Sequence, residues 1–161
     1  MATFWTKLYF TPYRATTIVS AYSASEILAK LNEATRRGAN FREKLDNAYK
    51  LNGFVGESVF QVSLIVGQMN SFLPLIKGRV EPTTLGCIIF IKYELFASSR
   101  ILLLMWSFVP FLIAISNIFL LQNYAYAVVA LAFALLNYGI TIANFHKQCR
   151  ISEKTLEKIM R

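Results

Sequence analysis

No charged residue occurs between Arg100 and Lys147, although the chain contains 17 Lys and Arg and 9 Asp and Glu residues. A helix rises about 1.5 Å per residue, so crossing about 30 Å of hydrocarbon takes roughly 20 residues. The uncharged run 101–146 is therefore long enough for two membrane crossings and too long for one. A hydrophobic content of 55% and a mean hydropathy of +0.44 also point to a membrane protein.

The middle of this run holds its most polar triplet, Gln122, Asn123 and Tyr124. A turn there divides the run into two spans, at about 101–121 and 124–145. The sequence therefore predicts a two-helix transmembrane hairpin over 101–146.

Small and polar residues recur every three or four positions in both spans, and this spacing lets two helices pack closely in lipid. Folding the chain back at Gln122 places Asn137 opposite Ser107, and we expect hydrogen bonds between the helices there and at Asn117. We interpret the two rows as packing within one chain; the alternatives are an oligomer interface or a polar pore lining. The helix-packing residues are Ser107, Pro110, Ala114, Asn117, Ala127, Ala130, Ala134 and Asn137.

Basic residues flank the spans and are missing from the turn, which predicts that both chain ends face the cytoplasm. Residues 1–100 contain 12 basic and 7 acidic residues, and residues 147–161 contain 5 and 2. The first 13 residues lack the apolar stretch of a secretory signal, so we expect the preceding domain to stay in the cytosol. Arg100, Lys147 and Arg150 are candidate contacts to anionic lipid.

Residues 1–100 are expected to form a cytosolic α+β domain, a small antiparallel sheet with one main helix. Ser23 and Glu26 have capping-box spacing, so a helix should begin there and end at Arg36, Arg37 and Gly38. Alternating apolar residues and turn residues predict strands at 14–22, 53–56, 59–66, 72–81 and 87–96.

The last strand is largely apolar on both faces at its start, so we expect it to be central in its sheet or covered on both sides. After the hairpin, residues 147–161 form a basic amphipathic cytosolic tail. Leu156, Ile159 and Met160 give that tail an apolar side, and it could continue the second span.

No pattern typical of an enzyme occurs, and we expect a non-enzymatic protein without a metal or cofactor. His146 is the single histidine, and no metal-ligand spacing or phosphate-binding glycine loop is present. No disulfide framework can be read from the two cysteines, Cys87 and Cys149. The basic cluster 36–44 lacks a nucleic-acid-binding fold, so nucleic acid is not an expected partner.

The segment 70–78, Asn-Ser-Phe-Leu-Pro-Leu-Ile-Lys-Gly, is unusual because proline lacks a ladder donor and implies a strand edge or a bulge. Besides a purely structural role, the segment could contact a partner or ligand. The candidate contact residues are Asn70, Phe72, Pro74, Lys77 and Arg79.

Together with Pro12-Tyr13, the Ser23/Glu26 helix start, Phe54-Val55-Gly56 and the apolar spans, this segment resembles a group of small bacterial membrane proteins of uncharacterised function. The resemblance covers about residues 12–121. It implies the same architecture and assigns no site residues.

We therefore expect an accessory or scaffold protein whose cytosolic domain binds a partner subunit of a larger membrane complex. One alternative is a ligand-gated effector whose hairpins assemble into homo-oligomers and disrupt the bilayer. A lipid-binding protein is the third hypothesis, and it requires an apolar cavity under the sheet.

Overall fold

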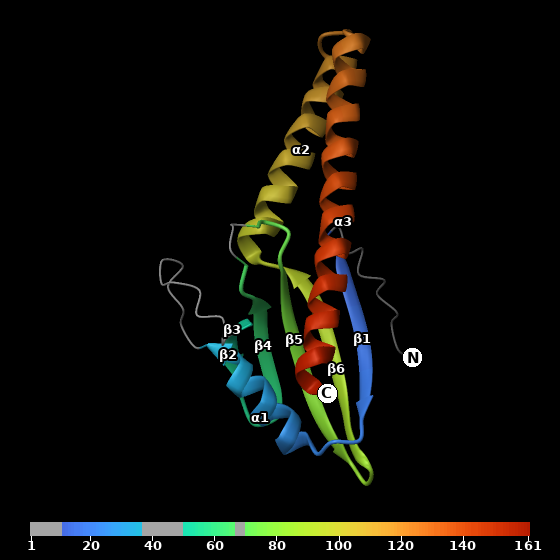
Figure 1. Cartoon of the computed structure of the whole chain (residues 1–161). Coiled ribbons are helices and arrows are strands. Elements are labelled where there is room, and N and C mark those ends of the chain that lie inside the picture. Colours follow the sequence, from blue (N-terminus) through green and yellow to red (C-terminus); the bar gives the residue numbers. More distant parts are fainter. Residues whose placement is uncertain (1–10, 37–49, 67–69) are drawn as a thin grey trace, which may run out of the picture.

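The computed structural model describes residues 11–36, 50–66 and 70–161. It is an α+β structure in which a six-stranded sheet packs against helices, and two long helices project beyond one end of the sheet (Figure 1). The α+β class predicted from the sequence is confirmed. The predicted antiparallel sheet is corrected to a mixed sheet, because one strand pair is parallel.

The sheet has the strand order β1-β6-β5-β4-β3-β2. All neighbours are antiparallel except β2 and β3, where Thr35 pairs with Leu51 and Arg36 with Asn52. The strands are β1 Tyr13–Ser20, β2 Thr35–Arg36, β3 Leu51–Val55, β4 Val59–Leu64, β5 Pro74–Thr83 and β6 Gly86–Leu95.

Helix α1, Ala24–Ala34, begins at the predicted capping box. The Ser23 hydroxyl accepts a hydrogen bond from the Glu26 amide, and the Glu26 carboxylate accepts one from the Ser23 amide. The helix ends at Ala34, so its predicted end at Arg36, Arg37 and Gly38 is wrong for Arg36, the only one of the three residues that the structure describes. Thr35 and Arg36 are already extended, because they form β2; residues 37 and 38 lie outside the described residues.

The hydrophobic core lies on one face of the sheet, under α1 and the C-terminal part of α3. Gly78 on β5 is part of this face and pairs with Phe60 on β4. A Cβ atom at Gly78 would lie 2.0 Å from Cζ of Phe60, so the ring occupies the space that a side chain would need. Gly86 lets β5 turn into β6 at a φ of 142°, which side chains rarely adopt.

Pro74 was expected at a strand edge or bulge, and the structure corrects this. β5 lies between β6 and β4, and Pro74 is its first residue. The pairing of β5 with β4 starts only at Ile76, so no ladder bond on that side needs an amide at Pro74. The side chain is buried.

Strand β6 is central, as predicted, but only one of its faces is covered. Cys87, Ile89, Ile91, Tyr93 and Leu95 are buried against the core, whereas Phe90 and Lys92 on the other face are exposed. No described element covers that second face. Its apolar content therefore does not reflect a second packed layer.

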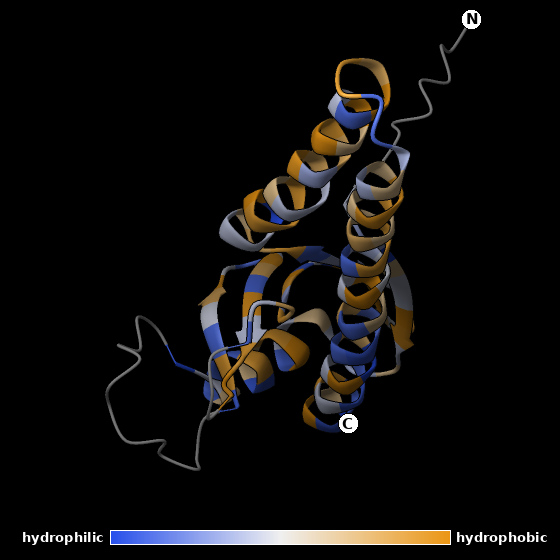
Figure 2. Cartoon of the chain, turned by 90° about the horizontal axis from the view of Figure 1, so that it is seen from above, coloured by the Kyte–Doolittle hydropathy of each residue, from blue (hydrophilic) through white to orange (hydrophobic). Residues whose placement is uncertain are grey.

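Helices α2, Ala97–Phe119, and α3, Tyr124–Met160, are both long and apolar enough to cross a membrane. Most of their apolar side chains face away from the protein; only 22% and 17% of the most apolar windows are buried. They turn at 120–123, where Gln122 has a φ of 50° and the Asn123 side chain accepts a hydrogen bond from the Tyr126 amide. Figure 2 shows the apolar colouring along both helices and the more hydrophilic C-terminal part of α3.

The two helices meet along the small residues of their facing sides. Ser107, Ala114, Ala127 and Ala134 are buried between them, and Pro110, Asn117, Ala130 and Asn137 are partly buried. Asn137 Nδ2 lies 3.4 Å from Ser107 Oγ, which is the expected contact between the helices. The expected hydrogen bond from Asn117 to the other helix is wrong, because its side-chain Nδ2 donates to the Ile113 carbonyl of its own helix at 2.9 Å.

Enlarging a side chain in this interface should separate the helices. Ala134 is 6% exposed, so Ala134→Leu should lower the free energy of unfolding by about 1–3 kcal/mol. Ala132→Leu adds the same atoms at an exposed position of α3 and should be nearly neutral. Thermal unfolding in detergent compares the two variants; equal shifts would contradict this packing.

Helix α3 continues past the hairpin and packs on the sheet. Phe145, Cys149, Ser152, Leu156 and Met160 recur at three- and four-residue intervals and are all buried. At about 1.5 Å per residue the 37-residue helix is about 55 Å long, so about 25 Å remain beyond a 30 Å hydrocarbon layer. Residues 147–161 were expected as a tail; residues 147–160 instead continue the helix of the second apolar segment and cover the core.

Polar contacts add to this docking of α3. Arg14 on β1 donates to the Glu153 carboxylate at 2.7 Å, and the Thr16 hydroxyl donates to the other oxygen at 3.3 Å. The backbone carbonyl of Arg161 accepts from the Tyr22 hydroxyl at 2.9 Å and from Lys30 Nζ at 3.0 Å. The end of α3 is therefore held by β1, by α1 and by the chain between them.

Candidate functional site

The uncovered face of the sheet, which we call the open face, carries a mixture of charged and apolar side chains. It consists of the outward residues of β1, β6, β5, β4 and β3. Its exposed apolar residues are Val19, Phe54, Val59 and Phe90, and its central cations are Lys77, Arg79 and Lys92. A sheet face of this kind is available for binding.

The register brings the cations of the open face together. Lys77 on β5 lies directly opposite Lys92 on β6, and the next outward pair is Arg79 opposite Phe90. Residues opposite each other on neighbouring strands have Cβ atoms about 4.5–5.5 Å apart, and like charges in such a pair are destabilising. The positive charge is thus concentrated on the neighbouring strands β5 and β6.

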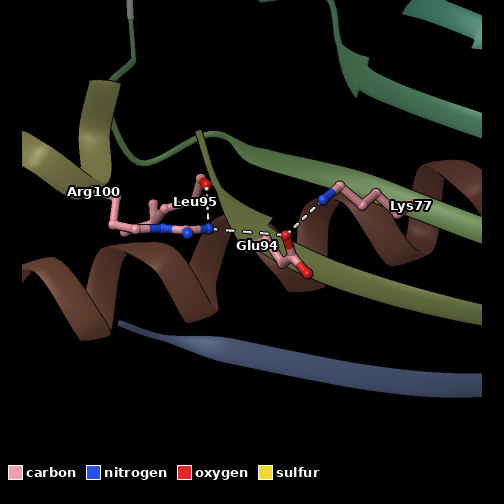
Figure 3. A network of polar contacts seen from close by, with 4 residues as sticks. All are labelled: Lys77, Glu94, Leu95 and Arg100. Carbon is pink, nitrogen blue, oxygen red and sulfur yellow. Dashed lines mark hydrogen bonds and ion pairs between the residues drawn. The ribbon is translucent and has the colours of Figure 1, made fainter. Parts of the chain in front are cut away.

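Two carboxylates balance part of this charge, as Figure 3 shows for one of them. Glu94 accepts from Lys77 Nζ at 2.9 Å, and Arg100 Nη2 lies 3.9 Å from the same oxygen. Arg100 Nη2 also lies 3.5 Å from the Leu95 carbonyl, which ties the first turn of α2 to the end of β6. Arg79 pairs with Glu81 at 3.1 Å.

A shallow hollow of ≈ 540 Å³ lies in the middle of the open face. Phe90 supplies an apolar surface at its side, and four charged side chains surround it. Its lining consists of Lys77, Gly78, Arg79, Glu81, Phe90 and Lys92. The hollow can therefore take a ligand group that is both anionic and partly apolar.

A second cleft, which we call the junction cleft, lies where α2 leaves the sheet. It has a volume of ≈ 300 Å³, and its walls are mostly apolar. Pro110 lacks the amide that would bond to the Trp106 carbonyl, so this carbonyl next to the cleft has no helical hydrogen-bond donor four residues later. The lining residues are Ser71, Phe72, Leu95, Ser99, Leu102, Leu103, Trp106, Asn137 and Thr141.

The five residues proposed from the 70–79 segment do not form one site. Lys77 and Arg79 line the hollow of the open face, whereas Phe72 lines the junction cleft. Asn70 has a local role, because its side-chain oxygen accepts a hydrogen bond from the Phe72 amide at 2.9 Å. The buried Pro74 offers no contact surface.

The candidate lipid contacts lie near the start of α2 and along α3. Arg100 takes part in the Glu94 network, and its side chain remains 43% exposed. Lys147 and Arg150 are exposed on α3 just beyond the apolar segment. Their positions fit contact with lipid headgroups.

Sequence reasoning did not select Phe90, Lys92 and Glu94 as site residues. Their alternation with buried residues placed them on one face, but the apolar start of β6 left open whether that face is covered by another element. The signal available was the row of charges at alternate positions, 92 and 94 on β6 and 77, 79 and 81 on β5.

Two thiols, those of Cys87 and Cys149, lie in the hydrophobic core. Burial raises the pKa of the Cys149 thiol to about 12 and also raises the pKa of Cys87, so both thiols stay protonated at neutral pH. Both are free cysteines. Within residues 11–36, 50–66 and 70–161, no group of three His, Cys, Asp or Glu side chains could hold a metal ion.

Comparison with known proteins gives no match: neither family models, nor curated proteins, nor solved structures are similar enough to assign this chain.

Proposed function

We propose that this protein is a two-pass membrane protein with both ends in the cytoplasm. On this proposal α2 and the first part of α3 cross the bilayer as the 101–146 hairpin. The support is the apolar surface that both helices direct away from the rest of the protein. Soluble monomers rarely expose so large a continuous apolar area. The basic flanks at Arg100, Lys147 and Arg150 favour a cytoplasmic sheet domain.

We further propose that the sheet domain is a non-enzymatic scaffold that binds a partner protein of a membrane complex. The open face is the observation that carries this proposal. It joins exposed apolar side chains and charges on a rigid surface, which is the mixture found at protein interfaces. The open face has a fixed position relative to α2 and α3, because only Phe96 separates β6 from α2 and because α3 is docked on the opposite face of the sheet.

Site-specific photo-cross-linking in native membranes tests the scaffold function. A photoreactive residue in place of the exposed Thr17, which lies opposite Phe90, should give a discrete cross-linked protein. The same residue in place of the exposed Ile151, on α3, is the matched control and should give none. The partner should also copurify after mild detergent extraction. A lone monomer without an open-face cross-link would overturn this function.

Lipid binding is the second candidate, and the junction cleft favours it. The cleft lies beside the first turns of α2, where its apolar walls could accept a lipid chain beside the hydroxyls of Ser71 and Ser99. A photoreactive residue in place of Phe72, which lines the cleft from outside α2, would then cross-link to lipid. Its failure to capture lipid in native membranes would remove this candidate.

The bilayer-disrupting effector has less support. Its hairpins would have to present small and polar residues to neighbouring copies. In this chain Ser107, Ala114, Ala127 and Ala134 are already buried between α2 and α3.

A further inference from the structure

We infer that the open face recognises an acidic segment of its partner, through Lys77, Arg79 and Lys92 beside Phe90. This inference rests on the proposed scaffold function and specifies the chemistry of the partner.

The first argument is the unbalanced charge of the open face. Lys77 has Glu94 as its partner, and Arg79 has Glu81. Lys92 has no ion-pair partner among the residues that the structure describes, and it faces Lys77 across the strands. When Arg100 is included, the open face and its edge hold four cations and only two carboxylates, Glu81 and Glu94. An added carboxylate between Lys77 and Lys92 would remove the repulsion and form charge-assisted hydrogen bonds.

The second argument is the shape of the face at the same place. The ≈ 540 Å³ hollow has the three cations in its lining, together with the ring of Phe90, which is 40% exposed. Complementary charges across an interface give specificity, and an aromatic side chain supplies contact area. An acidic segment with an apolar residue next to its carboxylates satisfies both features.

Distance favours a protein over the membrane surface as the source of the carboxylates. The strands run along the direction of the long helices, so the open face stands away from the end where α2 begins (Figure 1). Lys92 is three residues before the end of β6, which is about 10 Å at the rise of a strand. Attraction to anionic lipid decays within a Debye length of about 8 Å. Arg79 and Phe90 lie still further along the strands.

The test uses the full chain in nanodiscs of phosphatidylcholine and a fluorescent glutamate-rich peptide that contains one tryptophan. The wild type should bind it, and affinity should fall as salt is added. Lys92→Glu should weaken binding by about tenfold or more, and Lys92→Gln should weaken it less. Lys154→Glu makes the same charge change at an exposed position on α3 and should leave affinity unchanged.

Three results would overturn the inference. These are a wild type that does not bind the peptide, equal losses for Lys92→Glu and Lys154→Glu, or Lys92-dependent binding to phosphatidylserine vesicles in place of the peptide. If the peptide fails while Thr17 still cross-links to a protein, the scaffold function stands and only the acidic partner is wrong. If the Thr17 cross-link itself is absent, the function fails.

Discussion

Leu156→Ala should destabilise the protein by about 2–5 kcal/mol, the usual cost of truncating a buried leucine. Leu156 is fully buried where α3 lies on the sheet, and it belongs to the same core as Tyr93 and Ile91. The cavity would weaken the docking of α3 and loosen the sheet domain. Denaturant unfolding in detergent, followed by tryptophan fluorescence and by protease sensitivity of the sheet domain, measures the effect.

Ile151→Ala is the matched control for this prediction. Ile151 is on the same part of α3 but is 44% exposed, so its truncation should change stability by about 0.5 kcal/mol or less. Similar losses for Leu156→Ala and Ile151→Ala would show that α3 is not docked through this face.

Gly78→Ala should destabilise the sheet by about 1–3 kcal/mol through overpacking. The new methyl group would overlap the ring of Phe60, with Cβ only 2.0 Å from Cζ. Phe60 is 2% exposed, so its ring has no free space to move into. Thermal unfolding of the purified protein reports the loss.

A second substitution separates the steric effect from other causes. Phe60→Leu removes the overlapping atoms, so the double variant should lose less stability than the two single losses added together. Gly139→Ala is the control, since a Cβ there meets nothing within 4 Å. Additive losses in the double variant would contradict the packing of Phe60 over Gly78.

The parts of the fold that local signals specify were predictable. The capping box of Ser23 and Glu26 forms because its partners are three residues apart, and the turn at 120–123 follows from polar residues inside an apolar run. The facing of Ser107 and Asn137 follows from counting residues away from that turn. The capping box and the turn are each specified by a few neighbouring residues, and the helix register follows from the position of the turn.

The parts that depend on distant segments were not predictable. β2 is two residues long and exists only because Leu51 and Asn52 lie beside it in parallel. The open face could not be separated from a covered one, because Ile88 and Phe90 look like core residues in a sequence. The docking of α3 also includes Cys149 and Ser152, which are too small or polar to identify an apolar stripe.

The continuity of α3 has a mechanical consequence. A helix that is longer or shorter than the bilayer adjusts by tilting, and here the tilting segment has no break before it reaches the sheet. In the proposed two-pass topology, a change in bilayer thickness would therefore tilt α3 and the whole sheet domain together. The angle at which the open face meets the proposed partner would then depend on the thickness of the membrane.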